Sequence, residues 1–243
     1  MISMVNVTKS YRLGARRLDA LHDVNLQVRR GDFIVIVGRS GAGKSTLLGV
    51  LGGLLRPSVG QVLVEGQSIW HVPESARAQL RIHKIGFVFQ NASVIEPLTV
   101  LENVLLPRVL AARSDAETRV RAMALIAALG LGDKIHVFPE QLSGGERRRV
   151  AIASALMNDP AVLIADEPTG DLDPETERLL MEHLIRQNRT GTAIVMVTHN
   201  RGLARYANRL FRMDAGRLVE DPLKAVIPSL FAVQSAEAEG QWP

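Results

Sequence analysis

Glycine, lysine and serine are spaced between residues 38 and 46 in a way that suits phosphate binding. The segment GRSGAGKST contains the pattern G-x-x-x-x-G-K-[ST]. Glycines at Gly38, Gly41 and Gly43 let backbone N–H groups turn inward around phosphate oxygens. Lys44 adds a fixed positive charge, and Ser45 can ligate Mg²⁺. The residues expected to contact a nucleotide are Gly38, Arg39, Ser40, Gly41, Ala42, Gly43, Lys44, Ser45 and Thr46.

A second group of candidate residues follows the apolar run AVLIA, residues 161–165. Asp166 and Glu167 come directly after this run, where the carboxyl end of a parallel strand would place ligand-binding side chains. Asp166 is suited to hold hydrated Mg²⁺, and Glu167 is suited to polarise an attacking water as a general base. Either acid could instead cap a helix, but the phosphate-binding segment upstream favours the catalytic interpretation.

Two more polar side chains come at the ends of apolar runs. His199 follows AIVMVT (193–198), where its imidazole could donate to a γ-phosphate oxygen, and Gln90 ends IGFVFQ (85–90) with an amide suited to water and metal. Each could also be an ordinary polar residue at a strand end. We predict Glu167, His199 and Gln90 as the catalytic residues, and Ser45, Gln90 and Asp166 as the metal ligands.

The elements that must position these residues are those of an α/β fold. FIVIV (33–37) predicts a buried strand and STLLGVLGGLL (45–55) a helix whose N-terminus faces the bound anion. The runs 161–165 and 192–198 alternate with a helix at 174–187, which predicts a parallel sheet with crossover helices. Strand and helix in this order leave little room for a chance glycine turn at 38–46.

The segment LSGGE (142–146) is the most discriminating one, because a generic phosphate-binding ATPase does not require it. With it, the sequence resembles the nucleotide-binding subunits of ATP-binding cassette (ABC) transporters over residues 2–220. The resemblance rests on Walker A (Gly38 to Ser45), the Q-loop residue Gln90, the signature (142–146), Walker B (162–166), the catalytic Glu167, the D-loop (170–173) and His199.

This resemblance implies that two subunits pack head to tail as a homodimer, with each ATP between the Walker A segment of one and the signature of the other. Ser143, Gly144 and Gly145 would then bind the partner's nucleotide, since a helix N-terminus attracts a γ-phosphate. Tyr11 could stack on adenine, an interaction worth roughly 1–3 kcal/mol. Packing of Tyr11 in the core remains an alternative.

The resemblance also implies that the chain folds around a P-loop NTPase core with a parallel sheet. Residues 4–28 are strand-rich and are expected to form an N-terminal antiparallel β subdomain. Helix-forming residues at about 91–157, broken at Pro107, Gly130 and Pro139, are expected to form an inserted helical subdomain. Residues 2–220 would make one nucleotide-binding domain, followed by a loosely ordered tail at 221–243.

Composition excludes several other classes of protein. The absence of cysteine excludes disulfides, thiolate metal sites and cysteine nucleophiles. The formal net charge of +4 suits a nucleotide or a membrane-proximal position and requires no nucleic acid, and the cluster ERRR (146–149) is expected to be a solvated helix face or to contact acids. No apolar run of 18 residues and no leader sequence is present, so a cytoplasmic location is expected.

Within the family, LGGLLRPSVGQVLVEG, LTVLENVLLP and LIADEPTGDLD resemble the lipoprotein-release and macrolide-exporter branch. That branch usually shows two glutamines at Arg147 and Arg148, arginine at Ser154 and asparagine at Asp171. These departures leave the hydrolytic residues intact, so an active ATPase is expected.

The resemblance implies an energy-coupling subunit, peripheral on the cytoplasmic face of the membrane. It would drive a separate permease that moves a hydrophobic or amphiphilic substrate such as a lipoprotein, peptide or drug. An ATP-driven mechanical switch that regulates a cell-envelope enzyme through a membrane partner, without transport, remains open. A soluble nucleic-acid or ribosome factor would be expected to carry tandem cassettes or a long coiled-coil insertion, which this sequence lacks.

The segment NASVIEPLTVLENV (91–104) is the predicted contact with the permease. Its apolar residues Val94, Ile95, Leu98 and Val100 lie in a turn-rich stretch, where an amphipathic helix could dock on them. The alternative is that these four side chains pack the interior of the helical subdomain.

Overall fold

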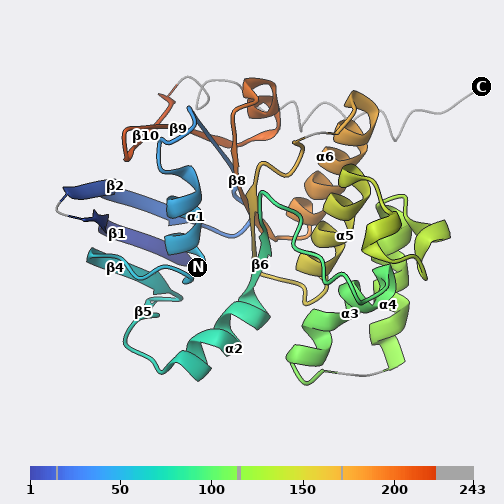
Figure 1. Cartoon of the computed structure of the whole chain (residues 1–243). Coiled ribbons are helices and arrows are strands. Elements are labelled where there is room, and N and C mark those ends of the chain that lie inside the picture. The colour runs from blue at the N-terminus through green and yellow to red at the C-terminus, as the bar shows by residue number, and fades with distance from the viewer. Residues whose placement is uncertain (15, 114–115, 171, 223–243) are drawn as a thin grey trace, which may run out of the picture.

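Two β-sheets organise the computed structural model, which describes residues 1–14, 16–113, 116–170 and 172–222 (Figure 1). The smaller sheet is antiparallel, with the strand order β2-β1-β4-β5. Its strands are β1 (Ile2–Leu13), β2 (Arg16–Val28), β4 (Val59–Val64) and β5 (Gln67–Ser68). The predicted antiparallel region is therefore present, and it also includes β4 and β5 from beyond the first helix.

The larger sheet has the order β10-β9-β3-β8-β7-β6, and all neighbours are parallel except the antiparallel pair β9 and β10. This confirms the predicted α/β fold with a parallel sheet. The strands are β3 (Phe33–Gly38), β6 (Ile85–Val88), β7 (Val162–Asp166), β8 (Ala193–Thr198), β9 (Arg209–Asp214) and β10 (Arg217–Glu220).

Both faces of the parallel sheet are buried, and alternate side chains of one strand enter different cores. In β3, Phe33 and Val35 pack with the helices on one face, whereas Ile34 and Ile36 pack on the other. This explains why the central strands are apolar throughout rather than alternating with polar residues.

The helices cover the two faces of the parallel sheet in different ways (Figure 1). Helix α1 (Lys44–Leu51) packs between the two sheets, where its Leu48 shares a core with Met4 of β1 and Val62 of β4. On the other face lie α3 (Val100–Leu110), α4 (Ala116–Ala128), α5 (Gly144–Leu156) and α6 (Pro174–Arg189), with the short 3₁₀ turns η1 (Gly132–Lys134), η2 (Pro139–Gln141) and η3 (Arg201–Tyr206).

Helix α3 continues through Pro107, so the predicted break at this residue is wrong. Proline has no N–H to bond the carbonyl of Asn103, which normally weakens a helix. The Ser154 hydroxyl of α5 donates to that carbonyl at 3.1 Å instead. A contact from another helix thus satisfies the group that the proline leaves free.

Two differences from the predicted elements lie between β5 and α3. Helix α2 (Glu74–Lys84) was not predicted; it has no fully buried residue, and its Arg77 and Arg81 pair with Glu74. Strand β6 ends at Val88, because its pairing with β7 ends at Ala165, so Gln90 lies in a loop rather than at a strand end.

No helix in the described part of the chain is both long enough and apolar enough to cross a membrane. Of the predicted tail, Asp221 and Pro222 are described, and the remainder lies outside the described residues.

Candidate functional site

A pocket of about 600 Å³ lies at the carboxyl ends of β3, β7 and β8. It collects most of the predicted nucleotide-binding and catalytic side chains, which come from segments far apart in the sequence. The pocket is lined by Tyr11, Leu18, Ala20, Ser40, Gly41, Gly43, Lys44, Ser45, Thr46, Gln90, Asn91, Arg148, Asp166, Glu167, Gly170 and His199.

The glycines of the loop between β3 and α1 serve two different purposes. Gly41 and Gly43 have φ values of 76° and 103°, in the left-handed region that favours glycine. Gly38 has no such φ; a Cβ atom there would lie 2.5 Å from the carbonyl oxygen of Met213 on β9. Gly38 is therefore needed for the close approach of β3 and β9, not for the inward turn that was predicted for it.

Lys44 opens helix α1 and bends back over the loop that precedes it. Its Nζ donates to the carbonyl oxygens of Gly38 at 2.8 Å and Arg39 at 3.2 Å. The helix has Gly43 as its N-cap and no side-chain cap, so no capping side chain occupies the N–H groups of the first turn, whose residues Lys44, Ser45 and Thr46 line the pocket. A helix N-terminus and a lysine at one place form an anion-binding site.

Asp166 is a buried carboxylate of the pocket, and the exposed Ser45 lies beside it. Asp166 ends β7 and is 7% exposed. Burial raises the pKa of this carboxyl group, while its hydrogen bond with Ser45 and the nearby charges of Lys44 and Arg148 oppose the rise. One carboxylate and one hydroxyl, next to an anion site, are a suitable partial set of ligands for Mg²⁺, which also uses phosphates and water.

Glu167 and His199 are in direct contact, because β7 and β8 are parallel neighbours paired at Asp166 and Val197. His199 Nδ1 lies 3.0 Å from Glu167 Oε1, and the His199 N–H donates to Oε2 at 3.3 Å. The Glu167 side chain is 12% exposed and that of His199 76%. The carboxylate is thus held at the pocket wall, while the imidazole reaches toward solvent.

The opposite wall of the pocket is formed by the β1–β2 hairpin. Tyr11 is half-buried and pairs across the hairpin with Leu18, and Ala20 lies beyond it. Tyr11 therefore lies at the pocket rather than in the core. Leu18, Ala20 and Asn91 were not predicted, since only the strand register brings the first two beside Tyr11.

The predicted signature residues lie at the start of α5 and do not line this pocket. The Ser143 Oγ accepts from the Glu146 N–H at 3.3 Å, and a Glu146 carboxylate oxygen accepts from the Ser143 N–H at 2.8 Å, which forms a capping box. Lys134, followed by the Ser143 N–H, lowers the pKa of Glu146 to about 2. Ser143 and Gly144 are exposed and Gly145 is half-buried.

The arginines after Glu146 do not share one environment, so the predicted solvated face is wrong for Arg148. Arg147 is half-buried and lies 3.8 Å from Glu96, as expected for a contact to an acid. Arg148 is only 7% exposed and lines the pocket that also contains Lys44 and Glu167. It lies one helical turn before Ile152, on the face of α5 that packs against the sheet.

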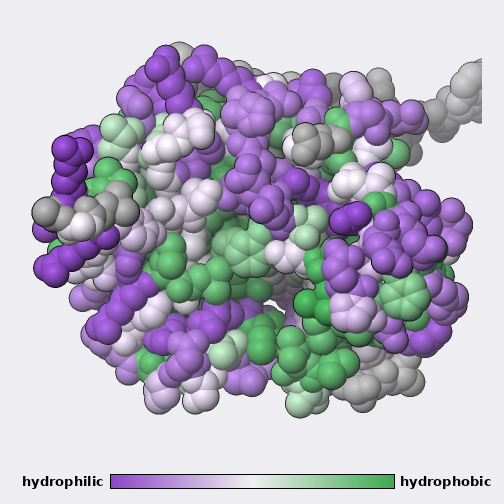
Figure 2. Space-filling view, in the orientation of Figure 1, coloured by the Kyte–Doolittle hydropathy of each residue, from purple (hydrophilic) through white to green (hydrophobic). Residues whose placement is uncertain are grey.

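A more apolar groove of about 480 Å³ lies between β6, α2, α3 and α5. Its side chains include the exposed Leu54, Phe89 and Leu110, none of which was predicted. Figure 2 shows apolar surface around a hollow in this part of the molecule, between the positions of α2 and α3.

The apolar residues of segment 91–104 divide between the interior and the surface. Val100 is fully buried and Val94 packs against the core, as the packing alternative expects. Leu98 is half-buried, and Ile95 is 45% exposed. Ile95 is thus the one member of the four that the surface prediction describes well.

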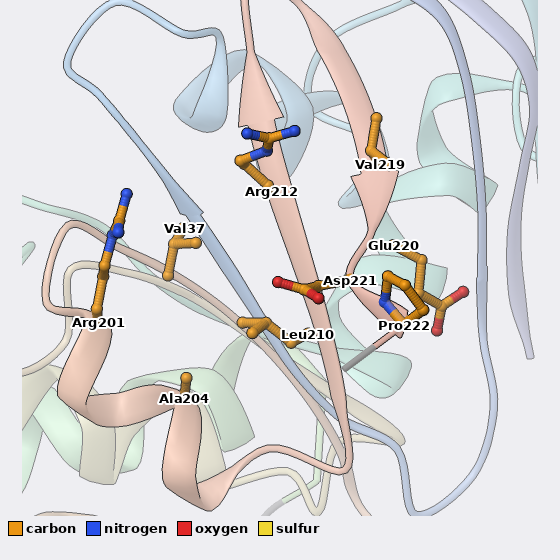
Figure 3. A pocket seen from close by; sticks show the side chains of 9 residues that line it. All are labelled: Val37, Arg201, Ala204, Leu210, Arg212, Val219, Glu220, Asp221 and Pro222. Atoms are coloured by element: carbon orange, nitrogen blue, oxygen red, sulfur yellow. The ribbon is translucent and has the colours of Figure 1, made fainter. Parts of the chain in front are cut away.

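A third pocket of about 520 Å³ lies between η3 and the β9–β10 hairpin and contains none of the predicted site residues. Figure 3 shows Val37, Ala204 and Leu210 facing it, with Arg201 and Arg212 nearby. It shares no lining residue with the pocket that contains Lys44 and Glu167.

The known proteins that this chain resembles are ATP-binding proteins of ABC transporters, which agrees with the phosphate-binding features of the pocket. A family model described as ABC transporter matches residues 21–170. The lipoprotein-releasing system ATP-binding protein LolD of Aquifex aeolicus is 45% identical over 204 residues, which are 84% of this chain and 91% of that protein. The macrolide export ATP-binding/permease protein MacB of Wolinella succinogenes is 40% identical over 90% of this chain, which covers 34% of MacB.

Among solved structures, the dimeric post-hydrolysis state of the ATP-binding cassette MJ0796 bound to ADP and Pi is similar over 91% of this chain and 98% of that one. The TM-score is 0.87 and the sequence identity 38%.

Proposed function

Because this chain belongs to the ABC transporter family and is an ATP-binding subunit that hydrolyses ATP, we propose that it drives a separate membrane permease. The pocket that joins the Lys44 loop to Asp166, Glu167 and His199 carries the proposal. Residues 2–220 would act as one nucleotide-binding domain, with the helices at about 91–157 as an inserted subdomain. The names of LolD and MacB support a hydrophobic or amphiphilic substrate.

The phosphates, the adenine and the metal ion each have a suitable partner in the pocket. Lys44 and the N–H groups at the start of α1 would hold the β- and γ-phosphates, and Tyr11 would stack on the adenine. Ser45, Asp166 and Gln90 would hold Mg²⁺, which neutralises charge on the phosphates. The Ser45 side chain lies close enough to Asp166 to oppose the rise of its pKa, which supports their role as neighbouring ligands.

Glu167 would act as the general base for the attacking water. Its side chain is 12% exposed and is fixed by two contacts from His199, so the carboxylate can accept a proton without rearranging. The exposed imidazole of His199 would contact the γ-phosphate. The proton would move from the water to Glu167 as the water oxygen attacks the γ-phosphorus, and the bond from that phosphorus to the β,γ-bridging oxygen would break, so that ADP leaves with the bridging oxygen and phosphate is released.

The position of the signature supports a head-to-tail homodimer. Ser143 lies at the exposed N-terminus of α5, outside the pocket of its own chain, so it would face the nucleotide of a second copy. The solved relative MJ0796 is dimeric in the presence of ADP and Pi, which agrees with this arrangement.

The apolar groove between α2 and α3 would receive the permease. Leu54, Phe89 and Leu110 are 44%, 41% and 59% exposed, which is the pattern expected of anchors for the apolar face of a short helix. The groove begins at Phe89, next to Gln90 of the nucleotide pocket, so binding at one would be felt at the other. The protein would then lie on the cytoplasmic face of the membrane.

The Glu167→Gln variant tests the ATPase mechanism. The amide keeps the shape of the side chain but cannot accept the proton, so kcat should fall by about 10²–10⁴-fold while ATP binding persists. The ATP-bound dimer should accumulate in size-exclusion chromatography, and adding Lys44→Ala to this variant should abolish the dimer. Wild-type turnover by Glu167→Gln, or a monomer at saturating ATP, would contradict the assigned roles.

The permease contact can be tested separately with Leu110→Asp. A charge in the groove should reduce the amount of a polytopic membrane protein that co-purifies with the tagged chain from detergent-solubilised membranes. Val120→Asp is the matched control, because Val120 is 69% exposed on α4 and does not line the groove. Equal recovery of the membrane protein with both variants would exclude the groove as the contact.

A further inference from the structure

The main chain of Glu167 has an unusual conformation that three other segments hold in place. Its φ of 48° lies in the left-handed region, which is unfavourable for a residue with a Cβ atom. The Glu167 N–H donates to the Val197 carbonyl of β8 at 3.0 Å. The Glu167 carbonyl accepts from the Gly170 N–H at 3.1 Å and from Arg148 Nη1 at 2.7 Å.

Arg148 reaches this carbonyl from inside the protein at an energetic disadvantage. It is 7% exposed, and no carboxylate in the described part of the chain forms an ion pair with it. Within those same residues its buried Nε also finds no acceptor. Burying a cation with incomplete partners is unfavourable for folding, and such arrangements are concentrated at functional sites.

The direction of the Glu167 carboxylate depends on the turn that Arg148 holds. The strand ends at Asp166, and rotation about the N–Cα bond of Glu167 moves its carbonyl group and its side chain together, so a change in this φ would swing the side chain away from His199 and the pocket. We propose that Arg148 is a positioning residue for Glu167, which holds the left-handed turn through the main-chain oxygen and so aims the carboxylate at the attacking water. This inference rests on the proposed role of Glu167 as general base.

The hydrogen bond from Arg148 connects the Glu167 turn to helix α5 and, through it, to the signature residues. Arg148 lies in the second turn of α5, and Ser143 caps the same helix. The end of α5 that would face the partner's nucleotide is therefore joined to the catalytic carboxylate of its own chain by one helical turn and one charged hydrogen bond. A shift of α5 away from β7 would loosen the Glu167 turn, and a shift toward β7 would tighten it.

Kinetics of Arg148→Met and Arg148→Lys test the proposal. Methionine has similar length but no donor, so kcat should fall by about 10–100-fold while KM for ATP changes by less than about twofold. Lysine keeps a charged donor and should recover part of the lost kcat. The matched control is Arg121→Met, because Arg121 also donates to main-chain carbonyls, those of Leu156 and Met157, but far from the pocket. Its kcat per folded molecule should equal that of the wild type.

A double-mutant cycle with Glu167→Gln gives a readout that a purely structural role would not produce. If Arg148 acts through the Glu167 carboxylate, Arg148→Met should not slow the residual single-turnover rate of Glu167→Gln any further. An additive loss in the double variant, a wild-type kcat for Arg148→Met, or equal losses in Arg148→Met and Arg121→Met would overturn the proposal. Loss of turnover in Glu167→Gln together with full turnover in Arg148→Met would reject this inference but leave the proposed function intact.

Discussion

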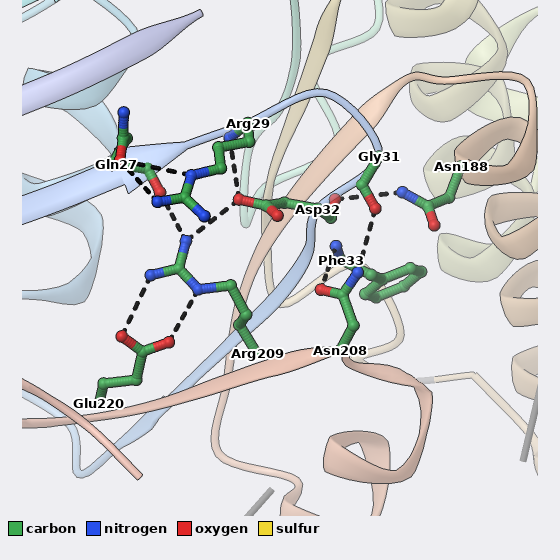
Figure 4. Close-up of polar contacts among 9 residues, drawn as sticks. All are labelled: Gln27, Arg29, Gly31, Asp32, Phe33, Asn188, Asn208, Arg209 and Glu220. Atoms are coloured by element: carbon green, nitrogen blue, oxygen red, sulfur yellow. Dashed lines mark hydrogen bonds and ion pairs between the residues drawn. The ribbon is translucent and has the colours of Figure 1, made fainter. Parts of the chain in front are cut away.

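The two ends of the parallel strands use polar side chains in opposite ways. We call the side of the sheet where the parallel strands begin its amino edge, and the side where they end its carboxyl edge. At the amino edge, a network links the β2–β3 turn to α6 and β9 (Figure 4). Asp32 is 8% exposed, and its carboxylate accepts from the Arg29 N–H at 2.8 Å and from Arg209 Nη1 at 3.1 Å. Arg209 also makes two hydrogen bonds to Glu220, at 2.8 and 3.1 Å.

Amide side chains complete the network at the amino edge. Asn208 accepts from the Phe33 N–H at 2.8 Å and donates to the Gly31 carbonyl at 3.1 Å. Asn188 donates to the Asp32 carbonyl at 3.1 Å. These side chains satisfy main-chain groups where β3 begins, so they hold the strand in position and have little capacity left for a ligand.

The carboxyl edge has groups of the same types with fewer protein partners. The His199 side chain is 76% exposed, Lys44 bonds only two carbonyls of its own loop among the described residues, and Arg148 Nε has no acceptor there. A buried polar cluster whose hydrogen bonds are complete thus stabilises the fold. A cluster with hydrogen-bonding capacity left over, facing a pocket, is where a ligand binds.

Breaking the complete network should have the largest effect on stability. Asp32→Ala removes the acceptor of two hydrogen bonds and leaves the Arg29 N–H without its partner, which should lower the free energy of unfolding by about 3 kcal/mol. Urea denaturation measures this loss. The kcat per folded molecule should stay at the wild-type value, and a specific loss of kcat would show that the two edges are not independent.

Removing the charge of Lys44 at the carboxyl edge should weaken ATP binding and leave stability unchanged, which is the reverse of the pattern expected for Asp32→Ala. Lys44→Ala should weaken ATP binding by about 2 kcal/mol, or roughly 30-fold, because a charged hydrogen bond to phosphate is lost. Isothermal titration calorimetry measures the affinity. The urea midpoint should stay unchanged, since Lys44 contacts only loop carbonyls in the described structure. A large drop in the midpoint would mean that Lys44 belongs with the stabilising groups.

A substitution at the start of α5 should have the smallest effect on stability. The N-terminus of this helix is exposed, and its capping box already provides partners for main-chain N–H groups there. Glu146→Gln removes the ion pair with Lys134, whose atoms lie 2.9 Å apart, and should lower stability by about 0.5–1 kcal/mol at pH 7. The folded-state pKa of about 2 is below the ordinary value of 4.5. The stabilisation is therefore complete above pH 4.5 and is lost as the pH falls toward 2.

Denaturation of wild type and Glu146→Gln between pH 7 and pH 3.5 checks this sign. The difference between the two proteins should narrow below about pH 4.5. Glu140→Gln serves as the control, because it makes the same change of side chain at an exposed position in η2, close to α5 in the sequence. A difference that widens on acidification would mean that Glu146 is not stabilised as a carboxylate.

Features made by neighbouring residues were determined by the sequence alone. The loop from Gly38 to Ser45 is continuous, so its spacing specifies where N–H groups, a charge and a hydroxyl meet. The buried strands β3, β7 and β8 were predictable for the same reason, since their apolar runs are local. The order of the motifs then indicated that Asp166, Glu167 and His199 lie at one edge of the sheet.

Features made by distant residues were decided only by the tertiary structure. Three such features each need two elements that the sequence does not place relative to each other. They are the close approach of Gly38 to Met213, the hydrogen bond from Ser154 to the carbonyl that Pro107 leaves free, and the groove beside Phe89. Arg148 is the sharpest case, because three arginines in a row give no sign of which one faces the core. That depends on how α5 rotates against the sheet, and packing against β6 and β7 sets this rotation through interactions between residues far apart in the chain.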